Sequence, residues 1–221
     1  MLKKIYFSVA AKRIYPGLTS HSSVISDFFN ALVIMVLSRP GSCLTMQNGL
    51  ADGGDMLIAD AFVNNSLWPT PVLKLHGIFP FKQDDYLKTI NDREHFNLLL
   101  GFCDELFCPD TTYVEGKNPV AVQARARAYR AQASRLFSPC DFLMALADEH
   151  DEPKAGGTTE TIELALNNKI PVIFISLVSG SISLIESLNN WHQLRERNHL
   201  ETEVSSREIC EKLFEAIVAK K

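Results

Sequence analysis

The stretch Lys154–Glu163, KAGGTTETIE, separates the apolar run Phe142–Ala147 from a second apolar run that begins at Ile170. Two adjacent glycines let the backbone turn sharply and let a ligand approach it closely. The threonines that follow are typical of a helix start, where the first N–H groups have no partner within the helix. A strand, a glycine turn and a helix in this order therefore predict an anion-binding turn. The same residues also suit a plain tight turn, capped by Thr158 and stabilised by Glu160 near the positive end of the helix dipole.

Apolar runs of this kind recur along the chain and alternate with segments of helical periodicity. Several strands separated by helices predict an α/β fold, with an open parallel sheet and helices on both of its faces. The predicted strands are Lys4–Ala10, Cys43–Asn48, Val72–Gly77, Phe142–Ala147 and Val172–Ser176, with a short one within Asp104–Asp110. The predicted helices are Ser23–Ser38, Gly53–Asn65, Glu94–Cys103, Pro119–Pro139 and Thr158–Lys169.

The character of the sequence changes near residue 178, where a polar segment replaces the regular alternation. We expect residues 1–178 to form one domain and residues 179–221 to form a C-terminal helical extension. Its last part, 205–221, reads as a capped amphipathic helix. Such a helix can pack on the edge of the sheet, serve as an arm in a dimer, or lead into a further domain.

Composition and charge exclude several classes of protein. The 221 residues are 46% hydrophobic and 22% charged, which is ordinary for a globular domain. No apolar run reaches the roughly 20 residues that span a bilayer, and the start MLKKIYFSVAAK reads as a strand, not a signal peptide. A net charge of −4 argues against nucleic acid as a partner. We therefore expect a cytoplasmic protein with no membrane or nucleic-acid partner.

The cysteines carry no recognisable metal or redox pattern. They are odd in number and scattered, and none shows a zinc-ligand spacing with the histidines. Free thiols in a reducing compartment are the expected state. Neither a metal, a disulfide nor a resident cofactor is predicted. The five positions are Cys43, Cys103, Cys108, Cys140 and Cys210.

A second glycine-rich turn, QNGLADGGD at 47–55, follows another predicted strand. In open parallel sheets, ligands bind beyond the carboxyl ends of the strands, where the strand order reverses. Two such turns can form facing anion cradles, so we expect both to line one cavity. Neither turn has the dinucleotide fingerprint or the lysine of a P-loop, which argues against an ordinary dehydrogenase or NTPase.

Taken in order, five segments resemble the SLOG superfamily: NGLADGGDMLIADAF, FPFKQDDYL, HFNLLL, AYRAQASRLFSPCDFLMALAD and AGGTTETIELALNNKIPVIFI. That superfamily groups DprA-type DNA-uptake proteins, LONELY GUY phosphoribohydrolases and bacterial nucleotide-sensor domains. The resemblance covers about Lys3 to Ser176 and is greatest to the branch found in bacterial defence and signalling systems. It implies a Rossmann-like fold that binds a nucleotide or nucleotide-derived molecule, often as a homodimer.

The resemblance also implies a set of site residues. The backbone of Gly53–Gly54 and of Gly156–Thr158 would hold phosphates, Asp55 or Asp148 would accept from ribose hydroxyls, and Tyr129 would stack on a base. Arg130 or Arg135 would contact a phosphate. The first strand reads SVAAKRIY where the family has a Gly-His-Arg-like turn, which leaves only Ser8 and Arg13 there. The full ligand-binding set is Ser8, Gly49, Gly53, Gly54, Asp55, Tyr129, Arg135, Asp148, Gly156, Gly157, Thr158 and Thr159.

Three functions fit these residues. The first is a sensor or regulatory module for a nucleotide-derived signal, with an effector protein or domain that reads out binding. The second is an enzyme that cleaves the N-glycosidic bond of a nucleotide, as a hydrolase or transferase. That chemistry needs a carboxylate near the anomeric carbon, and Glu160 is the catalytic candidate, with Asp148 and Asp55 as alternatives. The third is a protein-interaction module whose nucleotide site has decayed.

Overall fold

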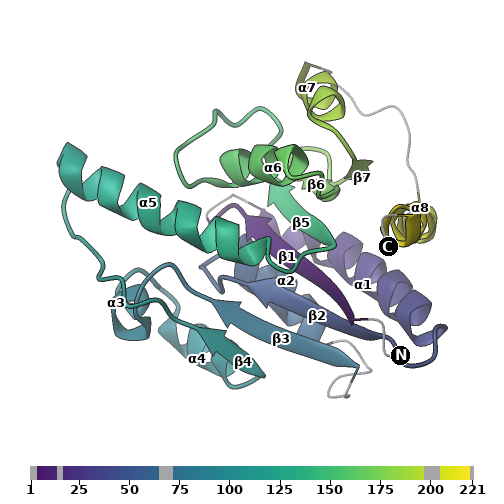
Figure 1. Ribbon diagram of the computed structural model, residues 1–221, viewed down its shortest axis with the longest axis horizontal. Helices are drawn as coiled ribbons and strands as arrows, with labels where there is room; N and C mark the ends of the chain where they lie inside the picture. Colours follow the sequence, from purple (N-terminus) through teal and green to yellow (C-terminus); the bar gives the residue numbers. More distant parts are fainter. Residues whose placement is uncertain (1–3, 14–16, 65–71, 197–204, 220–221) are drawn as a thin grey trace.

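The computed structural model describes residues 4–13, 17–64, 72–196 and 205–219 (Figure 1). Its centre is a seven-stranded sheet with the order β4-β3-β2-β1-β5-β6-β7. All neighbouring strands are parallel except β6 and β7, which are antiparallel. The fold is therefore α/β with a Rossmann-like open sheet, as the sequence predicts. The strands are β1 (Lys4–Ala11), β2 (Cys43–Asn48), β3 (Leu73–Ile78), β4 (Glu105–Phe107), β5 (Phe142–Ala147), β6 (Val172–Ser176) and β7 (Ile182–Ile185).

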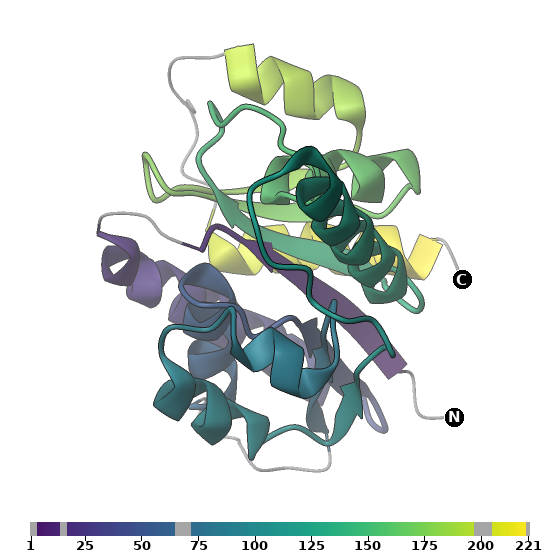
Figure 2. The same cartoon turned by 90° about the vertical axis from the view of Figure 1, so that its left-hand side faces the viewer.

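Helices cover both faces of this sheet. One face carries α1, α2, α4 and α8, and the other carries α5, α6 and α7, as the view along the sheet in Figure 2 makes clear. A short 3-10 helix, Leu18–His21, precedes α1. The α-helices are α1 (Ser22–Leu37), α2 (Gly54–Val63), α3 (Gln83–Leu87), α4 (Arg93–Leu100), α5 (Pro119–Leu136), α6 (Thr158–Asn167), α7 (Leu188–Glu196) and α8 (Ser206–Ala219). Asn65, the predicted end of the second helix, lies outside the described residues.

The central strands β2, β5 and β6 are covered on both of their faces. Every residue of β2, β5 and β6 is buried. On the α1 side, the ring of Phe7 in β1 stacks on Phe142 in β5, with centroids 5.1 Å apart. Strands that are buried on both faces are continuously apolar and lack the alternation of a half-exposed strand. This explains why the apolar runs in the sequence predict the bounds of β5 and β6 correctly.

The C-terminal segment packs on the same core. Strand β7 extends the sheet beyond β6. The ring of Trp191 in α7 lies edge-on to Phe174 in β6, with centroids 5.2 Å apart. Helix α8 packs against α1 through Ile209, Leu213 and Ile217, which are buried. Sequence periodicity does not predict α3, β7 or α7, because each is short and set among polar residues.

Within the described ranges, no helix combines the length and the apolar character that crossing a membrane requires.

Candidate ligand-binding site

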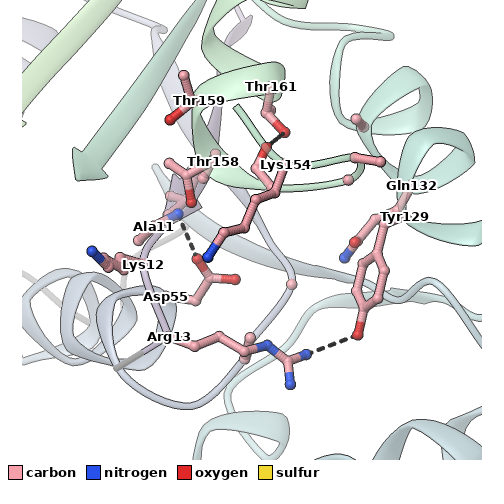
Figure 3. A pocket seen from close by; sticks show the side chains of 18 of the residues that line it. Ala11, Lys12, Arg13, Asp55, Tyr129, Gln132, Lys154, Thr158, Thr159 and Thr161 are labelled. Carbon is pink, nitrogen blue, oxygen red and sulfur yellow. Dashed lines mark hydrogen bonds between the residues drawn. The ribbon is translucent and has the colours of Figure 1, made fainter. Parts of the chain in front are cut away.

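The strand order reverses between β1 and β5, and a cavity of about 630 Å³ opens at the carboxyl ends of these strands. Residues of both glycine-rich turns line it (Figure 3). Gly49 and Asp55 come from the turn after β2, and Gly156, Gly157 and Thr158 come from the turn after β5. The two turns therefore contribute to one cavity at the position that the fold favours for ligands.

The first turn supports the cavity but does not present its helix end to it. The N–H of Gly54 donates to the carbonyl of Lys12, at 3.0 Å. Gly53 has φ +88, and a Cβ there would lie 1.7 Å from the carbonyl oxygen of Arg13. Neither glycine is among the residues that line the cavity. The backbone of Gly53 and Gly54 packs against the segment that leaves β1, so the structure gives no support to the expectation that these glycines hold a phosphate.

The second turn does present its helix end. Gly156 takes the left-handed conformation, with φ +75, and its N–H donates to the carboxylate of Glu160. The N–H of Gly157 donates to the carbonyl of Lys154, at 2.8 Å. Within the described part of the chain, the N–H groups and hydroxyls of Thr158 and Thr159 make no hydrogen bond, and both threonines line the cavity. At this helix start, the backbone groups that lack a hydrogen-bond partner among the described residues are therefore those of Thr158 and Thr159 and not those of the glycines.

Glu160 ties α6 to α5 instead of facing the cavity. Its carboxylate accepts from Nε and Nη2 of Arg130, at 3.0 and 2.7 Å, and from the N–H of Gly156. The hydrogen bonds from Arg130 are the main cause that lowers the pKa of Glu160. Glu160 is also absent from the lining of the cavity. The structure thus places Glu160, the catalytic candidate from the sequence, in an ion pair that joins α6 to α5.

The wall opposite Thr158 and Thr159 contains the partly buried guanidinium of Arg13. Nη2 of Arg13 donates to the phenolic oxygen of Tyr129 at 3.0 Å, and Nη1 donates to the carbonyl of Thr89 at 3.4 Å. Among the described residues, Arg13 has no carboxylate within 4.0 Å. Burial acts to lower the pKa of Arg13, but nearby Tyr129, Tyr86 and Asp55 outweigh it and the pKa is raised. Arg13 is thus a cation available to a ligand.

Tyr129 itself has little free surface for stacking. Its ring meets Phe81 edge-on, with centroids 5.5 Å apart, and it packs so closely against Gly156 that a Cβ there would lie 2.8 Å from Cβ of Tyr129. Its hydroxyl is engaged by Arg13. The structure therefore favours a polar role for Tyr129 over the expected stacking on a base.

Asp55 is the buried carboxyl group of the cavity. One of its oxygens accepts from the N–H of Ala11 at 3.0 Å, and the N–H of Ala51 also donates to it. Burial raises the pKa of Asp55 to about 7, although Arg13 acts in the opposite direction. A carboxyl group with such a pKa can hold or release a proton near neutral pH.

The free energy of unfolding is expected to fall as the pH rises because of Asp55, and Asp55→Asn is expected to abolish this decline. Between about pH 4 and pH 7, Asp55 is ionised in the unfolded chain but still protonated in the folded protein, so folding loses stability as the pH rises. The full loss corresponds to about 4 kcal/mol, since each pKa unit is worth about 1.4 kcal/mol. Asparagine cannot ionise. Urea unfolding at several pH values should therefore show the advantage of wild type over Asp55→Asn shrinking from pH 4 to pH 8.

Asp84→Asn, which changes an exposed aspartate at the start of α3, is the matched control for that series. A difference between wild type and Asp55→Asn that stays constant with pH would contradict the assignment.

The charged side chains around the cavity differ in how firmly they are held. Lys12 pairs with Asp151, at 2.7 Å. Arg125 donates to the carbonyls of Val114 and Gly116, at 2.6 and 2.8 Å. The side chain of Lys154 has no ion pair or hydrogen bond with the described residues, and in Figure 3 it extends from the second turn toward Asp55. Among the described residues that line the cavity, Lys154 is thus a cation with no partner of its own, which leaves it free to meet an anion.

Three other predicted residues lie away from the cavity. The hydroxyl of buried Ser8 donates to the carbonyl of Leu136 and so joins β1 to the end of α5. Arg135 places its guanidinium over the ring of Phe107, 4.9 Å from the centroid. Asp148 accepts from the N–H of His150, at 2.9 Å. None of the three lines the cavity.

The cavity also contains residues that the sequence did not nominate. Lys12, Tyr113, Arg125 and Lys154 line it, beside Arg13, which the resemblance had indicated. Lys12 and Arg13 directly follow β1. Their position could have indicated a role in the site, because polar residues after a strand of a parallel sheet lie where ligands bind. Tyr113 and Arg125 reach the cavity from the loop before α5 and from α5 itself, which no local pattern indicates.

The thiols and acidic groups show no metal or redox centre. The described residues contain no cluster of three or more histidine, cysteine or acidic side chains that could hold a metal ion. All five cysteines are free, and burial raises the pKa of Cys103, Cys140 and Cys210 to about 12. These three thiols are therefore poor nucleophiles at neutral pH.

No model of a known protein family matches the chain, and no curated protein matches it either. The resemblance to SLOG proteins thus stays a hypothesis that depends on the motifs alone.

Proposed function

We propose that the protein binds a nucleotide or nucleotide-derived signalling molecule in the cavity between β1 and β5 and acts as a sensor. The observation that carries the proposal is the open N-terminus of α6 facing the same cavity as partly buried Arg13 and buried Asp55. Unpartnered N–H groups at a helix start favour a phosphate, and a carboxyl group deeper in the cavity suits ribose hydroxyls.

The proposal gives each group a role. The N–H groups and hydroxyls of Thr158 and Thr159 hold a phosphate, with Lys154 adding a charge-assisted contact. Asp55 accepts from, or donates to, a hydroxyl according to its protonation state. Arg13 contacts a second polar group of the ligand, and its position is fixed by Tyr129. The partners proposed for such a sensor are a second copy of the chain and an effector protein or domain that reads out binding.

A second function is favoured by one observation. A buried carboxyl group with a pKa of about 7, in a cavity that also holds a guanidinium, suits general acid–base catalysis near neutral pH. If the protein cleaves an N-glycosidic bond, we propose Asp55 as the acid or base. Glu160 is the weaker candidate, because Arg130 and Gly156 occupy its carboxylate. The decayed-site alternative has less support, since the cavity and the open helix end are both present.

The first experiment identifies the ligand. Small molecules released by heat from the purified protein are analysed by mass spectrometry, and those found are titrated back by calorimetry together with AMP, ADP, NAD and ADP-ribose. Incubation followed by chromatography shows whether the bound nucleotide is recovered intact or as free base. Intact recovery supports the sensor, cleavage supports the enzyme, and failure of every nucleotide to bind contradicts both.

Glu160→Gln is expected to leave affinity within about threefold of wild type, because the ion pair that it removes lies partly in solvent. Any cleavage should continue in this variant. In Asp55→Asn, by contrast, cleavage should fall by about 100-fold or more, which is typical for loss of a general acid or base. Chromatography of the recovered nucleotide measures both. If Glu160→Gln stops turnover while binding persists, Glu160 is catalytic and the present role assignment is wrong.

A further inference from the structure

The loop 148–157 between β5 and α6 forms one wall of the cavity. It carries Asp151, Glu152 and Lys154 as well as the two glycines of the second turn. Figure 1 shows this loop as a long excursion between β5 and α6, on the side of the sheet that α7 also covers. A loop of this length needs contacts from elsewhere to hold one conformation.

Arg195, near the end of α7, supplies such contacts. Its Nε donates to the carbonyl of Glu149 and its Nη2 to the carbonyl of Asp151, both at 3.0 Å. Its Nη1 lies 3.7 Å from a carboxylate oxygen of Glu163 in α6. The rigid planar guanidinium thus joins the first half of the loop to α6, a geometry that a lysine cannot reproduce.

Two further contacts connect the same part of the loop to the sheet. The hydroxyl of Ser176, at the end of β6, donates to the carboxylate of Glu149 at 2.7 Å. The carboxylate of Asp151 pairs with Lys12, which follows β1 and lines the cavity. Asp151 is therefore held by Arg195 through its backbone and by Lys12 through its side chain. A shift of Arg195 would act on Lys12 through this one residue.

Helix α7 is itself held in place by its aromatic residue. Trp191 is buried against Phe174 of β6, and the guanidinium of Arg195 lies 5.8 Å from the centre of the Trp191 ring. The indole, the guanidinium and the loop therefore form a continuous set of contacts from β6 through α7 to the cavity wall.

We infer that Arg195 is a positioning residue for the ligand site, which fixes the loop 148–157 in the conformation that brings Lys154 and the open end of α6 into the cavity. Ligand occupancy and the placement of α7 are consequently coupled, and the coupling acts equally in both directions. The inference rests on the proposed function for the kind of ligand, but the clamp on the loop is a property of the protein alone.

Hydrogen exchange of the ligand-free protein tests the clamp. We compare wild type, Arg195→Met, which keeps an unbranched stem but has no donors, and Arg195→Lys. Arg207→Met is the matched control, since Arg207 is an exposed arginine of α8 whose ion pair, among the described residues, is with Glu211 of its own helix. In Arg195→Met, exchange of the amides in 149–157 should accelerate about tenfold, as expected for loss of two hydrogen bonds. Arg195→Lys should recover only part of the protection, and Arg207→Met should match wild type.

A merely structural role would give a different pattern. If Arg195→Met accelerates exchange equally in β5 and β6, the residue supports the whole domain and the inference is overturned. Unchanged exchange in 149–157 overturns it as well. The expected result is acceleration confined to the loop and the first turn of α6.

Inorganic phosphate, added at millimolar concentration, separates this inference from the proposed function. Phosphate should slow exchange at Thr158 and Thr159 in wild type and bind about tenfold more weakly to Arg195→Met, which follows if the clamp is worth about 1.4 kcal/mol. Equal phosphate affinity in both proteins would refute the link between clamp and site. If phosphate behaves as expected but no nucleotide binds wild type, the proposed function fails while the role of Arg195 stands.

Discussion

Gly53→Ala is expected to destabilise the protein by about 4 kcal/mol, a large part of the 5–15 kcal/mol that stabilises a typical domain. The added Cβ would lie 1.7 Å from the carbonyl oxygen of Arg13, and both atoms belong to the backbone or are fixed to it. The backbone of Gly53 also has φ +88 and ψ −121, a conformation that other residues adopt only with strain. Relief would require separating α2 from the segment after β1.

Chemical unfolding of Gly53→Ala beside Gly116→Ala measures this effect. Gly116 also has a positive φ, +108, but a Cβ there would meet nothing closer than 3.7 Å. The control therefore shows the conformational cost alone, which we expect to be about 1 kcal/mol. If the free energy of unfolding falls equally in the two variants, the close contact with Arg13 does not contribute to the destabilisation.

Gly157→Val is expected to weaken nucleotide binding by about 100-fold or more while the domain stays folded. Gly157 has φ −92 and ψ 173, which valine adopts readily, so the backbone itself does not forbid the change. A Cβ there would nevertheless lie 3.0 Å from the carbonyl of Lys154, the acceptor for the N–H of residue 157. The turn must shift, and the N–H groups of Thr158 and Thr159 move away from a phosphate, at a cost of about 1.5–3 kcal/mol for each charged hydrogen bond lost.

Gly101→Val is the matched control for the binding measurement. Gly101 ends α4, outside the cavity lining, and its Cβ would meet the carbonyl of Leu98 at a similar 3.2 Å. Calorimetric titration with the nucleotide recovered from the protein, together with thermal unfolding, compares the two. If Gly157→Val binds like wild type, the start of α6 is not the anion site and the sensor proposal loses its main support.

The strands were predictable because their residues are buried on both faces. A short, continuous apolar run such as Phe142–Ala147 is typical of a strand in a covered parallel sheet, and the glycine-rich turns mark where the chain leaves the sheet. The short antiparallel strand β7 was not predictable from its own residues. Half of Ile182–Ile185 is only partly buried, and pairing with β6 through a tight turn decides its conformation.

The roles within the site were less predictable than its location. The two Gly-Gly pairs look alike in sequence, yet Gly53–Gly54 faces the backbone of Lys12 and Arg13 whereas Gly156–Gly157 opens a helix toward the cavity. That difference depends on which neighbouring segment passes close by, a tertiary property. Glu160 illustrates the same limit, because only the folded chain brings Arg130 from α5 to its carboxylate.

The outer strand β4 determines where the sheet stops. An edge strand exposes backbone donors and acceptors that can pair with another chain and begin aggregation. Here the edge is three residues long, starts with a charged Glu105 and is followed two residues later by Pro109, which has no N–H to donate. Arg135 covers the ring of Phe107. On this side, the sheet therefore ends in a strand that is too short and too well covered to pair with the edge of another molecule. The buried apolar strands behind it are thus kept out of aggregation.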